Sequence, residues 1–113
     1  MTELSATDIA HRLKVTMPSI GFCSKSKRIN AFLMTVRMAD EMAAHNVDLV
    51  VEAIELLTLI SRPFKKALVV VMESLNQLSR VHFSDSAWLI ANTTATKEGY
   101  PTHRHYRHLA RLA

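Results

Sequence analysis

Residues 48–61 read DLVVEAIELLTLIS, and residues 63–78 read PFKKALVVVMESLNQL. Apolar residues recur at helical spacing in both segments, Ser61 is a favourable N-cap, and Pro63 suits the first turn of a helix. The two segments are therefore predicted to be helices joined by a tight turn. Both carry more hydrophobic surface than a 113-residue monomer needs, which predicts burial against a protein partner. A fold that consumes this surface internally is the alternative.

Helical signals continue on the N-terminal side of this centre. Ser5 to Asp8 resembles a capping box, and the helix that follows is expected to end at Pro18. A longer helix is expected from Ser26, its N-cap, to about His45. The basic cluster Lys25, Lys27 and Arg28 is expected to lie in a solvated loop that runs from Pro18 to Lys27.

On the C-terminal side, Ser84 is expected to cap a fifth, shorter helix that frays at residues 92–94, because Asn and Thr are poor helix formers. Thr102 is expected to cap a basic helix or tail over residues 102–113. Two glycines and three prolines give little turn chemistry for a many-stranded sheet. The sequence therefore predicts an all-α fold, a single domain over residues 1–113 that forms a compact bundle of five or six helices and a dimer.

The charge is concentrated at the end of the chain. The formal net charge is +4, yet the first 96 residues hold ten basic and nine acidic side chains. From Lys97 onward, four basic residues stand against Glu98 alone. A nucleic-acid partner would depend mostly on this basic tail, whose arginines are Arg104, Arg107 and Arg111.

Two features predict a cytoplasmic protein. Cys23 is the single cysteine, so the chain forms no internal disulfide and suits a reducing compartment. The N-terminal residues MTELSATDIAHRLK lack the apolar region of a secretory signal, and no apolar run approaches the ~20 residues of a membrane span. No membrane partner is expected.

His103, His105 and His108 form the one cluster with metal-ligand character. The neighbouring arginines repel a cation, so a pH-responsive or partner-docking tail is the preferred interpretation. The sequence contains no Gly-rich phosphate loop, activated serine or evident nucleophile–base pair. It therefore predicts no enzyme, no catalytic residue, no metal site and no cofactor.

DNA binding is the alternative function. The helices over 48–61 and 63–78 meet at a short turn, as in a helix-turn-helix, and Lys65 and Lys66 lie at the start of the second. The first has an acidic outer stripe that includes Glu52, which repels phosphate. A small basic DNA-binding regulator that uses these two helices and the basic tail remains the second prediction, and nucleic acid is the less expected partner.

The predicted partner surface lies mainly on the helix over residues 26–45. One apolar face begins at Ile29 and consists of residues at helical spacing. A second face consists of Met34, Met38 and Met42, at i, i+4 and i+8. Methionine adapts to varied surfaces, although it also fills cores. With the apolar face of the next helix, the predicted interface residues are Phe32, Met34, Val36, Met38, Met42, Leu49 and Ile54.

In size, helical pattern and lack of a catalytic motif, the chain resembles the small antiactivators of LuxR-type quorum-sensing regulators. The centre of the resemblance is residues 38–66, MADEMAAHNVDLVVEAIELLTLISRPFKK. The resemblance implies a dimeric bacterial protein that blocks the dimerisation surface of a transcription factor, so that DNA binding fails. It assigns no site residue.

Overall fold

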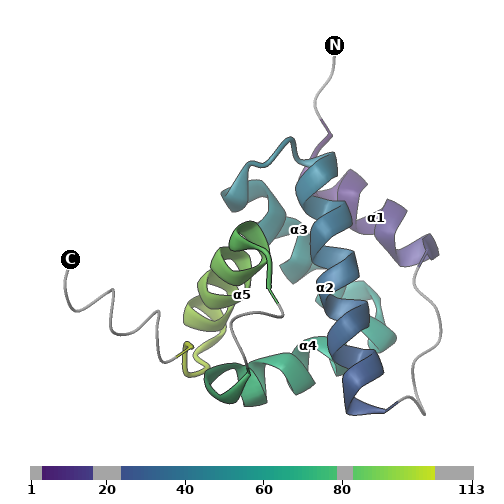
Figure 1. The fold of residues 1–113 in the computed structure, drawn as a ribbon. Helices are drawn as coiled ribbons and strands as arrows, with labels where there is room; N and C mark the ends of the chain where they lie inside the picture. Colours follow the sequence, from purple (N-terminus) through teal and green to yellow (C-terminus); the bar gives the residue numbers. More distant parts are fainter. Residues whose placement is uncertain (1–3, 17–23, 79–82, 104–113) are drawn as a thin grey trace, which may run out of the picture.

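The computed structural model describes residues 4–16, 24–78 and 83–103 of the chain. All regular secondary structure in these ranges is helical, which confirms the predicted all-α class. In chain order the elements are α1 (Ala6–Thr16), α2 (Lys25–Met42), α3 (Val47–Ile60), α4 (Arg62–Ser74), the 3₁₀ helix η1 (Leu75–Gln77) and α5 (Asp85–Glu98) (Figure 1).

The N-terminus of α1 is closed by the predicted capping box. The Asp8 amide donates to Ser5 Oγ at 3.1 Å, and the Ser5 amide donates to the Asp8 carboxylate at 3.3 Å. Hydrogen bonding of the Asp8 carboxylate to the side chain and the backbone amide of Ser5 lowers the pKa of Asp8. Local sequence therefore fixes where α1 begins.

Helix α2 begins and ends earlier than predicted. Ser24, and not Ser26, is its N-cap and accepts a hydrogen bond from the Lys27 amide at 3.3 Å. The basic residues that were expected in a loop therefore lie in the first helical turn. The helix ends at Met42 because Ala44 and His45 adopt left-handed backbone conformations, with φ of 49° and 65°, which an α-helix cannot contain.

Helix α3 is the central element and packs against α1, α2, α4 and α5. Asn46 caps its N-terminus by accepting from the Leu49 amide. In Figure 1, α3 lies behind α2, and α1, α4 and α5 surround the pair. The extent of the apolar surface on α3 is explained by this position, because its buried side chains meet several neighbours: Val50, Val51, Ala53, Ile54 and Leu57.

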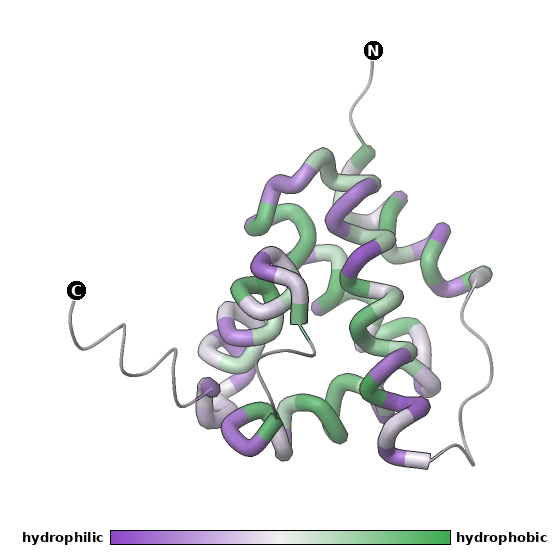
Figure 2. Tube along the Cα trace, viewed as in Figure 1, coloured by the Kyte–Doolittle hydropathy of each residue, from purple (hydrophilic) through white to green (hydrophobic). Residues whose placement is uncertain are grey.

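Helices α2 and α4 form an extensive contact. The rings of Phe32 and Phe64 stack there with their centroids 5.8 Å apart. Ser61 caps α4 as predicted by accepting from the Phe64 amide, and residues 67–72 (ALVVVM) lie within this helix. Figure 2 shows the hydrophobic character of α4 beside the alternating pattern of α2. The predicted single helix over 63–78 instead ends at Ser74, with η1 following it.

Helix α5 corrects the prediction that the chain frays at residues 92–94. It continues to Glu98, and Asn92 and Thr94 are fully buried. The Thr94 hydroxyl donates to the Ile90 carbonyl, and the Asn92 amide group donates to the Trp88 carbonyl, both at 2.8 Å. These bonds satisfy the polar side chains inside the helix, so their low helix propensity does not end it.

Gly99 ends α5 in the left-handed region at φ 76°. The Tyr100 amide then donates to the Ala95 carbonyl at 2.9 Å, which is the long bond of a Schellman motif. Pro18 and residues 104–113, which include the expected basic helix, lie outside the described residues. Within the described part of the chain, every helix is too short or too polar to cross a bilayer.

Candidate interaction surface

Three of the predicted interface residues lie inside the chain's own core. Phe32, Val36 and Ile54 are each exposed by 1% or less. The expectation that they face a partner is corrected by packing: α3 covers one side of α2, and α4 places Phe64 against Phe32. Their helical spacing did not distinguish an internal face from an external one.

The remaining predicted residues lie on the outer part of the fold. Met34 is 65% exposed, whereas Met38, Met42 and Leu49 are half-buried against the core. The methionine row is therefore exposed at Met34 and partly covered at Met38 and Met42. Of the seven residues, Met34 is the one that offers most of its side chain to a partner.

Leu59 is a more exposed apolar residue that was not among the predicted interface residues. It is 81% exposed near the C-terminal end of α3. It lies on the same stripe as Asp48 and Glu52, both exposed. A leucine within a polar stripe can be recognised in the sequence as a candidate contact residue. The exposure of Leu59 shows that it lies on the outer side of α3. Val15 on α1, at 86%, and Leu89 on α5, at 39%, are also exposed.

A groove of about 460 Å³ lies between the N-terminal half of α2 and the residue that follows η1. Ile29, Leu33 and Leu78 contribute half-buried apolar side chains to it. The two elements are distant in sequence, so no pattern along the chain predicted this groove. Its full lining is Lys25, Ser26, Ile29, Asn30, Leu33 and Leu78.

Basic residues begin both α2 and α4, and neither first turn contains an acidic residue. By contrast, α1, α3 and α5 each have an aspartate in the first turn. The Phe32–Phe64 stack joins the second turn of α2 to the first turn of α4. The basic residues at the two helix starts are Lys25, Lys27 and Arg28 on α2, and Arg62, Lys65 and Lys66 on α4.

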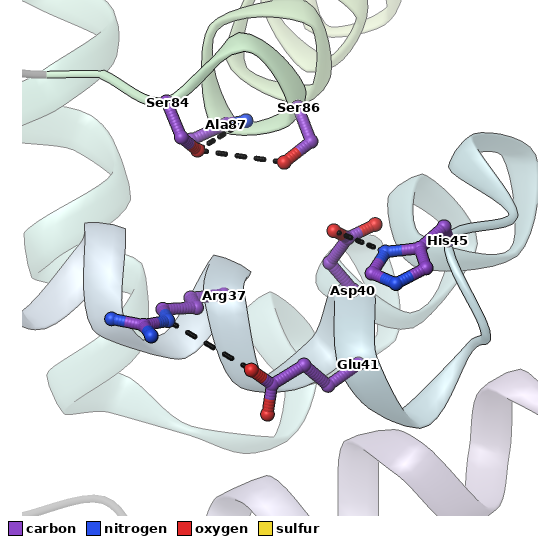
Figure 3. Close-up of polar contacts among 7 residues, drawn as sticks. All are labelled: Arg37, Asp40, Glu41, His45, Ser84, Ser86 and Ala87. Carbon is purple, nitrogen blue, oxygen red and sulfur yellow. Dashed lines mark hydrogen bonds and ion pairs between the residues drawn. The ribbon is translucent and has the colours of Figure 1, made fainter.

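The C-terminal half of α2 has its charges paired within the chain. Arg37 Nε lies 3.8 Å from Glu41 Oε1, and His45 Nδ1 lies 2.9 Å from Asp40 Oδ2 (Figure 3). By contrast, neither Lys25 nor Lys27 forms an ion pair with any of the described residues. Lys25 and Lys27, which form no ion pair with the described residues, therefore lie at the groove end of α2.

His103 is buried and serves a structural role in the described part of the chain. Its ring Nε2 lies 2.8 Å from the Leu78 carbonyl, and its amide donates to Asn92 Oδ1 at 2.7 Å. His105, His108 and the arginines Arg104, Arg107 and Arg111 lie outside the described residues. Among residues 4–16, 24–78 and 83–103, no group of three His, Cys, Asp or Glu side chains is arranged to hold a metal ion.

The helix-turn-helix comparison becomes weaker in three dimensions. A single residue, Ser61, separates α3 from α4, whereas the DNA-binding motif has a turn of three or four residues. Lys65 and Lys66 are exposed, but Glu55 on the outer side of α3 pairs with Lys97 of α5 at 3.4 Å. Glu55 therefore lies beside α5, while Asp48 and Glu52 of the same acidic stripe remain exposed.

No known family model, curated protein or solved structure matches this chain.

Proposed function

We propose that this chain is a non-catalytic regulator that binds a transcription factor and inhibits it. In this proposal it acts as a homodimer in the bacterial cytoplasm, as an antiactivator of a LuxR-type quorum-sensing regulator. It covers the surface through which the transcription factor dimerises. DNA binding by the factor then fails without any covalent chemistry.

The observation that supports the proposal is the exposure of Leu59, at 81%, on an otherwise polar stripe. Full burial of a leucine side chain contributes roughly 1.5–3 kcal/mol, so an interface at this position would gain from it. Met34, 65% exposed on α2, offers a second apolar contact. The core of the folded chain leaves both side chains outside.

The test measures DNA binding by a purified LuxR-type regulator from the same cell while the chain is added. We expect the regulator to lose its operator complex in a gel-shift assay as the chain approaches equimolar amounts. The variants Leu59→Glu and Met34→Glu should weaken this inhibition at least tenfold. Thr96→Glu adds the same charge at an exposed site of α5 and should leave inhibition unchanged.

Light scattering tests the homodimer separately, with an expected mass of twice the 12.7 kDa of one chain. Full operator binding in the presence of excess chain contradicts the antiactivator proposal. A strictly monomeric mass contradicts the dimer alone.

DNA binding by the chain itself is the second candidate, favoured by the exposed cations Arg62, Lys65 and Lys66 in the first turn of α4. Neutralised phosphates make affinity fall steeply with salt. A salt series with mixed-sequence duplex DNA measures this dependence. Tight, salt-steep binding that the double variant Lys65→Glu/Lys66→Glu abolishes would favour DNA binding over the antiactivator role.

A further inference from the structure

We propose that the groove between α2 and Leu78 binds an acidic amphipathic helix of a partner protein. The inference deepens the proposed function and rests on it, since that partner would be the regulated transcription factor. The groove is separate from the exposed Leu59 of α3. Its ligand chemistry follows from an apolar floor and a basic rim.

The floor calls for apolar side chains. Ile29 and Leu33 come from α2, and Leu78 comes from the segment after η1. Each is half-buried, so each still has surface that a ligand can cover. A volume of about 460 Å³ holds a few large side chains. An amphipathic helix binds such a groove by inserting the apolar side chains of one face into it.

The rim calls for negative charge. Lys25 lines the groove, and Lys27 lies in the same turn of α2 but outside the groove lining. Neither pairs with a carboxylate of the described residues. Positive charges in a helix's first turn also oppose its dipole, so an acidic ligand would relieve repulsion as well as form new ion pairs.

Other occupants fit these two features less well. A nucleic acid would satisfy the lysines but would place polar phosphates and sugars against the apolar floor. The chain's own C-terminal segment starts beside the groove, because His103 bonds to the Leu78 carbonyl. However, residues 104–113 contain three arginines and no acidic residue, so they would meet the basic rim with like charge.

A second copy of the chain fits less well. Its acidic stripe on α3 exposes a single large apolar side chain, Leu59, whereas the groove has room for several. An amphipathic helix rich in Asp and Glu is the occupant that satisfies both the floor and the rim.

The test uses fluorescence anisotropy with the full chain and a labelled peptide of about 15 residues, with leucines at i, i+3, i+4 and i+7 and glutamates elsewhere. Two further peptides separate the contributions: one replaces the leucines with alanine, and the other replaces the glutamates with lysine. Mixed-sequence duplex DNA is the fourth probe. Titrations at low and high salt measure how much of the affinity is electrostatic.

We expect the acidic leucine peptide to bind with a dissociation constant on the order of 10–100 μM, and the other two peptides to bind at least tenfold more weakly. Lys25→Glu/Lys27→Glu should weaken binding at least tenfold. Lys65→Glu/Lys66→Glu is the matched control, with the same charge change on α4 away from the groove lining, and should weaken binding less than threefold. Leu33→Ala should weaken binding with a native helical spectrum retained.

Four outcomes would overturn the inference. They are no binding of the acidic peptide, equal losses in the two lysine double variants, tighter binding of DNA than of the peptide, or a large gain in peptide affinity on removal of residues 104–113. The last would identify the chain's own tail as the occupant. The operator assay described above is independent, so a groove that binds the peptide while inhibition fails would contradict the proposed function alone.

Discussion

The N-termini of α1 and α2 have the same kind of cap and opposite charge. Ser5 caps α1, and its own amide donates to the Asp8 carboxylate. Hydrogen bonding to Ser5 lowers the pKa of Asp8. Ser24 caps α2, but Lys25 and Lys27 follow it and no acidic residue lies in the first turn. At the start of α1, the negative charge of Asp8 is favourable to the helix dipole. At the start of α2, the lysines are unfavourable to it. A helix start can therefore be well specified by its cap while its first-turn lysines form no ion pair with the described residues.

The largest expected effect comes from breaking the contact between α2 and α4. Phe32→Ala should lower the free energy of unfolding by about 3–5 kcal/mol, because it leaves a cavity beside Phe64 in the core. Urea denaturation followed by circular dichroism measures the change. Met34→Ala, on the exposed side of the same helix, should change stability by no more than ~0.5 kcal/mol. Similar losses in both would contradict the assignment of the two faces.

The caps themselves should differ according to burial. Ser61→Ala should cost about 1–2 kcal/mol, because the Phe64 amide that it caps is buried. Ser24 caps an exposed amide, so Ser24→Ala should cost roughly 1 kcal/mol or less. Thermal and urea unfolding of the two variants give the comparison. A reversed order would show that burial does not control cap strength in this fold.

Reversing a charge at the start of α2 should sharpen the comparison with α1. Lys27→Glu should raise stability by about 0.3–1 kcal/mol at low ionic strength, with a smaller gain in high salt. Asp8→Lys at the start of α1 should lower it. Urea denaturation at two salt concentrations measures both. A loss of stability in Lys27→Glu would reveal an internal role for Lys27 and weaken the case for an external anionic partner.

The smallest effect is the pH dependence contributed by Asp8. Its folded-state pKa is below the ordinary 3.8, so the unfolded chain takes up the proton first as the pH falls. The stabilisation is therefore complete above 3.8 and is lost as the pH drops toward the folded-state value. The stability difference between the wild type and Asp8→Asn should be constant near neutral pH and shrink in acid. A difference that grew in acid would contradict the sign.

Much of the local structure could be predicted because its causes are local. The Ser5 and Ser61 caps and the tight turn before Pro63 all follow from short sequence patterns. Prediction failed where a distant segment determined the outcome. Residues 92–94 remain helical, and Asn92 is held from both sides by Trp88 and His103.

The candidate site divides in the same way. A leucine within a polar stripe, Leu59, was visible in the sequence as a departure from periodicity. The groove was not, because its two sides come from α2 and from Leu78. Nor could periodicity show that Phe32 and Val36 belong to the core while Met34 does not.

From the sequence, the all-α class and most helix starts could be predicted. These depend on caps, periodicity and composition, which act over a few residues. Only the packed fold shows which apolar face of α2 is internal and that an apolar groove lies beside the start of this helix. Those outcomes depend on which segments meet in space, and the chain specifies such meetings only through the packing of the whole fold.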